Sequence, residues 1–335
     1  MELSVLERPG KEWDEFAFRY TDLIFYQSVW SEVLRKGLGG HPLYFCLKEK
    51  DDIVAGLPGV LFNFKLFKIF YASIPFGNLV GERGYFPALM ELAEKEFERR
   101  GVDQVRISDS PFSEPYFPPS YRSLPAKVSL LDLRGTDKEG IWNNHKKYIR
   151  RDVRKAEKSG VTIRPGSSAE DVRLFYDLYV ASMKRNRAAA KYPLQWFRVL
   201  CEGGPGESLG TIRFAVLDQT TIAGLVLIHS ASTTHYLHNG SRGEFLKYCP
   251  NELLVHSSIE EALDRRSSFF DFMGSDPSDA SLLKFKEKWG SHSRDSYTYI
   301  KDFHPLRSKI WELGKSMGNS QVGSWLMKLI RQGEG

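Results

Sequence analysis

The pattern of apolar and polar residues is clearest between Thr211 and Asp276. Two β-rich apolar runs flank Asp218-Gln219-Thr220 and predict a hairpin, and a third run, Thr234–Asn239, predicts a strand beside it. Apolar residues then follow the helical period through Pro250–Arg266, with proline at an early helical position, before a fourth strand begins at Asp271. The stretch therefore predicts three antiparallel strands, a covering helix and one further strand.

The same order of elements recurs between Leu43 and Pro111. A hairpin-like run precedes a third run at Phe67–Ser73, a helical pattern at Phe86–Arg100 and a strand at Gln104–Ser108. Short matches occur in the same order: Ala55-Gly56-Leu57 with Ala223-Gly224-Leu225, Glu94–Arg100 with Glu260–Arg266, and Asp109-Ser-Pro111 with Ser275-Asp-Pro277. Ordered matches of this kind indicate two copies of one unit.

We therefore predict an α/β (α+β) fold of two tandem domains, each a mixed, mostly antiparallel sheet with covering helices. The predicted domains are residues 1–125 and 126–303, followed by a C-terminal helical tail at 304–335. The length of 335 residues agrees with about two domains. The tail is either an amphipathic surface helix for a membrane or partner, or a segment packed against the body. Gly314, Gly318 and Gly323 weaken a surface helix and favour packing.

Composition narrows the class of protein. Hydrophobic residues make up 41% and charged residues 27% of the chain, as in a soluble protein with a core, and a net charge of +5 does not by itself indicate nucleic acid. Cys46, Cys201 and Cys249 are too widely spaced for a zinc module or a disulfide framework, which favours a reducing compartment. The chain shows neither a signal-peptide pattern nor about 18 successive apolar residues, so we expect a cytoplasmic protein that does not span a membrane.

The most basic stretch, Lys138–Ser159, predicts a helix from His145 to Lys158. Its apolar residues share an inward face with Trp142. The remaining face carries seven basic residues: Lys146, Lys147, Arg150, Arg151, Arg154, Lys155 and Lys158. Two interpretations stay open: a solvated helix with local pairs to Asp152 and Glu157, or a surface that holds a phosphate-bearing substrate.

Several catalytic signatures are missing from the sequence. It has no Gly-x-Ser-x-Gly elbow, phosphate-binding P-loop, His-Glu-x-x-His motif or Rossmann glycine fingerprint. Hydrolases that use such an elbow, nucleotide triphosphatases, zinc peptidases and dehydrogenases are therefore disfavoured. The remaining interpretation is an enzyme that acts by positioning its substrates and by stabilising the charge that develops in the transition state.

Motifs in both halves resemble one family. The second half contains Lys146–Val161, Pro250–Leu254, Phe270-Asp-Phe272 and Leu283–Gly290, and the first contains Tyr26-Gln-Ser-x-Trp30 and Ser73-Ile-Pro-Phe-Gly77. Over about residues 20–300 the chain resembles the FemAB-type peptidyltransferases, including FemAB-related proteins of bacterial polysaccharide loci. The resemblance implies two tandem GNAT-like domains, an acceptor bound in the second domain and between the domains, and transfer of an acyl or aminoacyl group to an amine.

The resemblance also implies site residues. Phe285-Lys286 matches the family's Phe-Lys pair, whose lysine neutralises charge developing at the reacting ester, as a fixed cation facing an oxyanion can. The alternative is a solvated charge between Lys284 and Lys288. Asp109 lies near the family's Asp-Pro step and is the second catalytic candidate, although here the order is Asp-Ser-Pro. The candidate substrate-binding residues are Arg150, Arg151, Tyr236, Asn239, Tyr248, Asn251, Phe285 and Phe76, and no metal site is predicted.

Two family features are missing: the coiled-coil arm of members that use aminoacyl-tRNA, and the acetyltransferase pyrophosphate loop. The donor therefore stays open between acyl-CoA and aminoacyl-tRNA. We predict an acyl- or aminoacyltransferase that forms an amide on an amine-bearing cell-envelope or sugar-linked precursor. The alternative is a non-catalytic GNAT-fold module that binds tRNA or an anionic membrane. The expected partners are an anionic small-molecule or lipid-linked substrate, tRNA, and the inner membrane face through the C-terminal tail, and the oligomeric state stays open.

Overall fold

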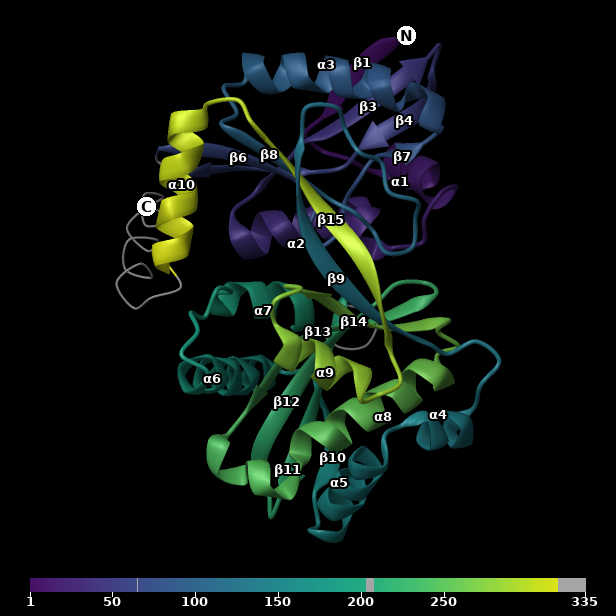
Figure 1. The fold of residues 1–335 in the computed structure, drawn as a ribbon, viewed down its shortest axis with the longest axis vertical. Coiled ribbons are helices and arrows are strands. Elements are labelled where there is room, and N and C mark those ends of the chain that lie inside the picture. Colours follow the sequence, from purple (N-terminus) through teal and green to yellow (C-terminus); the bar gives the residue numbers. More distant parts are fainter. Residues whose placement is uncertain (65, 203–207, 319–335) are drawn as a thin grey trace. The chain divides into compact units, whose positions relative to one another are not determined.

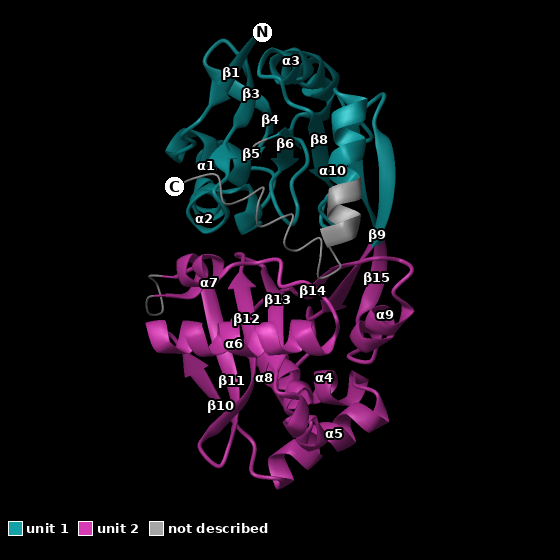
Figure 2. Cartoon of the chain, turned by 90° about the vertical axis from the view of Figure 1, so that its left-hand side faces the viewer, with its two compact units in different colours: residues 1–126, 295–335 teal, residues 127–294 magenta. Residues whose placement is uncertain are grey.

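The structure is a computed structural model that describes residues 1–64, 66–202 and 208–318 (Figure 1). The chain forms two compact units (Figure 2). Unit 1 contains residues 1–126 and 295–335, and unit 2 contains residues 127–294.

Unit 2 is built on one sheet with the strand order β10-β11-β12-β13-β14-β9. Its strands are β9 (Arg122–Asp132, of which residues 127–132 belong to this unit), β10 (Thr162–Gly166), β11 (Gly210–Leu217), β12 (Thr220–His229), β13 (Thr233–Ser241) and β14 (Phe269–Ser275). The pairs are antiparallel except for β13 and β14, which are parallel. The predicted hairpin is confirmed: Asp218 and Gln219 have positive φ angles of 45° and 63°, as a two-residue type I′ turn requires.

Helices pack on both faces of this sheet. They are α4 (Lys138–Asn144), α5 (Lys147–Lys158), α6 (Ala169–Arg185), α7 (Leu194–Cys201), α8 (Pro250–Asp264) and α9 (Ala280–Glu287), with a 3-10 helix η3 (Gly243–Tyr248). The predicted inward residues of α5, Ile149, Val153 and Ala156, are fully buried. They pack in one cluster with α8 and alternate residues of the strands, which we call the α8 cluster. On the opposite face α6 lies so close to Gly240 of β13 that a Cβ there would be 2.5 Å from the α6 backbone.

Unit 1 contains two sheets. The strands are β1 (Glu2–Leu6), β2 (His41–Pro42), β3 (Tyr44–Glu49), β4 (Asp52–Leu57), β5 (Val60–Phe64), β6 (Phe67–Ala72), β7 (Val80–Gly81), β8 (Gln104–Ser108) and β15 (His292–Asp302). One sheet has the order β1-β3-β4-β7, and the other β15-β8-β6-β5-β2. The helices are α1 (Lys11–Phe18), α2 (Ser28–Leu38), α3 (Phe86–Arg99) and α10 (Pro305–Gly318), with 3-10 helices η1 (Ile24–Tyr26) and η2 (Arg83–Tyr85).

The parallel strands β6 and β8, joined through α3, correspond to β13 and β14 joined through α8. One detail of the predicted repeat is wrong. The third run, now β6, does not lie beside the β3–β4 hairpin but pairs with β5 and β8. Pro58 and Gly59 separate β4 from β5. Proline lacks the N–H that a strand residue donates, and a Cβ at Gly59 would lie 2.1 Å from the Phe70 ring.

The C-terminal division also differs from the predicted one. Thr298–Asp302 of β15 pair with β8, so residues 295–303 belong to unit 1 because their backbone hydrogen bonds are made there. Helix α10 packs against unit 1 through Trp311, which is 4% exposed and lies 4.7 Å from Phe64 and 5.6 Å from Phe67 between ring centroids. This confirms the predicted packing for the start of the tail, whereas Trp325, Leu326, Leu329 and Ile330 lie outside the described residues.

Between residues 1 and 318, leaving aside 65 and 203–207, no helix combines the length and apolar character that crossing a bilayer would need.

Candidate functional site

The parallel pairing of β13 and β14 comprises three residue pairs and ends at His235 and Asp271. Beyond this point β14 contains an irregularity against β9 between Asp271 and Gly274, where Met273 has a positive φ of 64°. Bulges of this kind redirect backbone and side chains and are frequent beside active sites. The end of the parallel pairing therefore marks the candidate site of unit 2.

Lys286 of α9 holds this irregular part of β14. Its Nζ donates hydrogen bonds to the carbonyl oxygens of Met273 (2.7 Å) and Gly274 (3.3 Å) and to Ser275 Oγ (2.6 Å). The side chain is 4% exposed. Burial lowers the pKa of the ammonium to about 8, against the attraction of Asp271 and Asp279, which favours the charged form. Lys286 is thus a buried ammonium group whose pKa lies close to neutral pH, and it is not a solvated surface charge.

The local sequence explains how α9 presents this lysine. Asp279 caps the helix by accepting a hydrogen bond from Leu282 N at 3.0 Å. At the other end Ser291 Oγ donates to the Lys286 carbonyl at 2.9 Å. The preceding Phe285 is partly buried against the α8 cluster, and Lys288 Nζ lies 4.2 Å from its ring centroid. The backbone that carries Lys286 is therefore held on both sides.

Two predicted substrate-binding residues contact each other across β13 and α8. Asn239 Nδ2 donates to Asn251 Oδ1 at 3.3 Å, and Asn251 Nδ2 donates to Ser241 Oγ at 3.4 Å. Tyr236 packs at 5.9 Å from Phe272, between ring centroids, and its burial raises the pKa of its hydroxyl. These polar groups lie around the N-terminal turn of α8.

The remaining candidates near α8 and α5 are more peripheral. Tyr248 in η3 is partly buried, and Lys247 Nζ lies 5.1 Å from its ring centroid. Arg150 donates to the Asn143 carbonyl at 2.9 Å at the end of α4. Arg151 extends into solvent and pairs with Asp152 at 2.9 Å. The two arginines thus have different surroundings, although they are adjacent in sequence, and their substrate role stays a prediction.

Asp109 lies in unit 1, in a buried polar cluster. Its carboxylate accepts hydrogen bonds from Tyr299 Oη at 2.6 Å and from the Asn78 amide. Burial raises the pKa of the carboxyl group, and these two hydrogen bonds oppose the shift. Asn78 N in turn donates to Tyr26 Oη at 3.1 Å. A carboxyl group with a raised pKa is suited to proton transfer, and the catalytic role of Asp109 stays a prediction.

The two motifs of the first half meet in unit 1. Trp30 Nε1 donates to the Ile74 carbonyl at 2.6 Å, and Ser73 Oγ donates to the Phe25 carbonyl at 2.7 Å. Phe76 is 4% exposed and its ring lies 5.8 Å from that of Phe25. The residues that carried the resemblance here have structural contacts, and a substrate contact of Phe76 stays a prediction.

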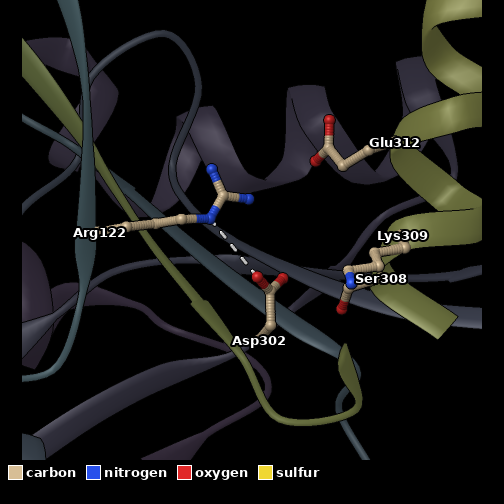
Figure 3. A pocket seen from close by; sticks show the side chains of 5 residues that line it. All are labelled: Arg122, Asp302, Ser308, Lys309 and Glu312. Carbon is tan, nitrogen blue, oxygen red and sulfur yellow. Dashed lines mark hydrogen bonds and ion pairs between the residues drawn. The ribbon is translucent and has the colours of Figure 1, made fainter. Parts of the chain in front are cut away.

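A cavity of about 380 Å³ also lies in unit 1 (Figure 3). It is lined by Arg122, Asp302, Ser308, Lys309 and Glu312. The Nε of Arg122 and Oδ2 of Asp302 form an ion pair at 3.4 Å. The lining charges balance, and none of the predicted site residues is among the lining residues.

Sequence reasoning did not single out the buried pair His235 and Asp271, whose Nδ1 and Oδ2 are 2.9 Å apart. The available signal was an aspartate inside an otherwise apolar strand, Phe270-Asp-Phe272, because buried carboxylates need partners. Among the residues of ranges 1–64, 66–202 and 208–318, no group of three or more His, Cys, Asp or Glu side chains is arranged to hold a metal ion.

The sequence of unit 2 matches the model of a known protein family. Residues 143–287 match the family described as acetyltransferase (GNAT) domain. Unit 2 contains a GNAT acyltransferase domain. The GNAT domain includes α5, β13, α8, β14 and Lys286. No curated protein matches the sequence.

Solved structures show how widely this fold extends along the chain. FemX is similar with a TM-score of 0.68 and 14% identity over 92% of this chain and 100% of FemX. L-PGS from Bacillus licheniformis gives 0.59 and 12% over 92% and 97% of the two chains. A tandem GNAT protein from the clavulanic acid biosynthesis pathway gives 0.57 and 12% over 90% and 98%. These similarities confirm the predicted α/β fold of tandem GNAT type and the resemblance to FemAB-like GNAT proteins at the level of the fold.

Proposed function

We propose that this protein is an acyl- or aminoacyltransferase that forms an amide on an amine-bearing cell-envelope or sugar-linked precursor. The observation that carries the proposal is the buried ammonium of Lys286 at the irregular part of β14 in the GNAT domain. Its position beside the end of the parallel β13–β14 pairing supports a role at the reacting group.

The reaction that fits this arrangement is attack of an amine on the carbonyl carbon of an activated acyl group. The carbonyl oxygen then gains negative charge, which a preorganised cation stabilises. The three protons of the Lys286 ammonium already have acceptors. The longest of these bonds, 3.3 Å to the Gly274 carbonyl, is the one that an oxyanion would replace. Lys286 would then contact substrate without losing its two short bonds.

The donor is either an acyl-CoA or an aminoacyl-tRNA. The clavulanic acid tandem GNAT protein is described without AcCoA, which makes this compound the first acyl-CoA to try. A second similar structure is the C-terminal domain of a putative lysylphosphatidylglycerol synthetase from Agrobacterium fabrum. The name of that protein describes a product in which lysine is attached to the anionic lipid phosphatidylglycerol. This supports lipid-linked anionic compounds as a second class of acceptor substrates for the assay. Arg150 and Arg151 are the proposed contacts for the acceptor's anionic group.

The test measures transfer with AcCoA and aminoacyl-tRNA in parallel, each with amine-bearing nucleotide-sugar and lipid acceptors, by release of CoA or deacylated tRNA. Lys286→Met keeps the aliphatic chain and removes the charge. Loss of one preorganised oxyanion donor lowers kcat by about 10²–10³. Lys284→Met, on the exposed side of the same helix, is the matched control and should retain turnover. Near-normal turnover in Lys286→Met would exclude the proposed role.

A second candidate function has its own observation. The outer face of α5 and the residue before it carry six exposed basic side chains, which we call the α5 cationic face: Lys146, Lys147, Arg151, Arg154, Lys155 and Lys158. Such a face can bind tRNA or an anionic membrane without catalysis, and would place a cytoplasmic protein at the inner membrane face.

This alternative predicts binding whose affinity falls steeply with salt. The Arg154→Glu/Lys155→Glu double variant should abolish binding to tRNA or to phosphatidylglycerol vesicles, while the Lys95→Glu control on α3 of unit 1 should not. Binding with no turnover for any donor would favour this function over the transferase. Turnover that is insensitive to the double variant would count against it.

A further inference from the structure

Three side chains of unit 2 form a hydrogen-bonded chain to which the proposed transferase reaction assigns no proton transfer, although the charge of Asp271 favours the ammonium form of Lys286. Asp271 Oδ2 lies 2.9 Å from His235 Nδ1, and His235 Nε2 lies 2.9 Å from Ser230 Oγ. His235 and Asp271 are fully buried, whereas Ser230 is half-buried and its neighbour Ala231 is exposed. The chain thus leads from the interior of the sheet to a surface turn.

The proton positions follow from the partners. A carboxylate only accepts hydrogen bonds, so His235 Nδ1 must carry the proton that points to Asp271. In a neutral imidazole Nε2 then has a lone pair and accepts from the Ser230 hydroxyl. The second carboxylate oxygen, Oδ1, accepts from Met273 N at 2.7 Å, which fixes the carboxylate plane. This is the hydrogen-bond order that activates a serine nucleophile.

The fold places His235 and Asp271 by strand pairing, and it places Ser230 by the turn that follows β12. His235 and Asp271 are partners in the last parallel pair of β13 and β14, so their side chains lie side by side on one face. Phe270 and Phe272 belong to the α8 cluster, and Asp271 between them therefore points to the opposite face. Ser230 follows β12 directly, in the tight turn that its amide closes by donating to the Thr233 carbonyl at 2.8 Å.

We propose that Ser230, His235 and Asp271 form a nucleophilic site that cleaves activated acyl esters, distinct from amide formation at Lys286. Ser230 Oγ bonds to the acyl carbon while its proton passes to His235 Nε2. The bond from carbon to the leaving oxygen then breaks, and this oxygen takes the proton. Water next attacks the acyl carbon and gives a proton to Nε2. The bond from this carbon to Ser230 Oγ then breaks, Oγ takes the proton back from Nε2, and the carboxylic acid leaves.

The sequence alone did not reveal this site, because its serine does not lie in a Gly-x-Ser-x-Gly motif. The flanking residues are His229 and Ala231, and the chain order is Ser, His, Asp. Hydrogen-bonded triads of this type are recognised by geometry and not by sequence order.

The experiment uses the full chain and two probes, a fluorophosphonate and p-nitrophenyl acetate. Labelling should map by peptide mass to Ser230, and Ser230→Ala should lose both this label and the ester hydrolysis above background. Ser232→Ala in the same turn is the matched control and should keep both. Asp271→Asn should slow labelling by about 10⁴, because an asparagine can stabilise the wrong histidine tautomer.

Asp271 is buried, so Asp271→Asn is interpreted only if its circular dichroism matches that of the parent protein. Ser230→Ala removes one atom from a half-buried turn and keeps the test decisive if the aspartate variant fails to fold. Absence of label at Ser230 in the parent protein, or equal hydrolysis in Ser230→Ala, would overturn the proposal. Either result leaves the role of Lys286 untouched, since that role is measured by amide formation.

Discussion

Because the ammonium group of Lys286 is buried, the free energy of unfolding should depend on pH by an amount that its pKa sets. Its pKa lies at about 8, below the ordinary value of 10.5 that it regains on unfolding. Between these pH values the unfolded chain binds a proton that the folded protein has released, so stability rises with pH. At 1.36 kcal/mol per pKa unit, the full effect is about 3 kcal/mol, of which about 2–3 kcal/mol develops between pH 7 and 10.

The assay compares Lys286→Met with the parent protein by denaturant unfolding at several pH values from 7 to 10. Other groups contribute in this range. Burial raises the pKa of the Cys46 thiol from 9.0 to about 12, so the unfolded chain releases this proton before the folded protein does and stability falls as pH rises. Such contributions occur in both proteins and cancel in the difference. The parent protein should therefore gain about 2–3 kcal/mol relative to the variant, while Lys284→Met should follow the parent.

A direct measurement checks the same reasoning. With ¹³C at the lysine ε-carbons, one resonance should titrate near pH 8 and be missing from the Lys286→Met spectrum. If every lysine resonance of the parent protein titrates near 10.5, or the stability difference does not change with pH, burial does not lower the pKa of Lys286.

Three further predictions concern packing and charge. Trp311→Ala should lower the free energy of unfolding by about 3–5 kcal/mol because the ring is buried, whereas Ile310→Ala, 60% exposed, should change it by less than about 0.5 kcal/mol in the same denaturant assay. Gly240→Ala should cost about 1–3 kcal/mol because its Cβ would lie 2.5 Å from the α6 backbone, and Gly243→Ala, whose nearest contact is 3.4 Å, should cost less. Burial lowers the pKa of His238 to about 3, so stability should fall as pH drops from 6.5 towards 3, and His238→Gln should flatten this dependence in thermal unfolding followed by circular dichroism.

Local pattern predicted much of unit 2. The hairpin around Asp218, the strand Thr234–Asn239, the helix that begins at Pro250 and the inward face of α5 all follow from short-range signals: turn chemistry, strand alternation and the helical period. In unit 1 the same signals located the helix α3 and the strand β8 but assigned β6 to the wrong neighbours. Strand pairing is a competition between distant segments, and the period of one segment does not record its outcome.

The features of the candidate site likewise fall into those that the sequence determined and those that only the tertiary structure decided. The sequence by itself determined the order of motifs, the resemblance that marked Lys286 and Asp109, and the basic character of α5. Only the tertiary structure decided that the Lys286 ammonium is buried against Met273, Gly274 and Ser275, and that Asp271 meets His235 and, through it, Ser230. The physical reason is that burial and hydrogen-bond partners set the chemistry of a charged group, and here both come from residues distant in sequence. The parallel pairing of β13 and β14 brings His235 to Asp271, and α9 brings Lys286 to the end of β14.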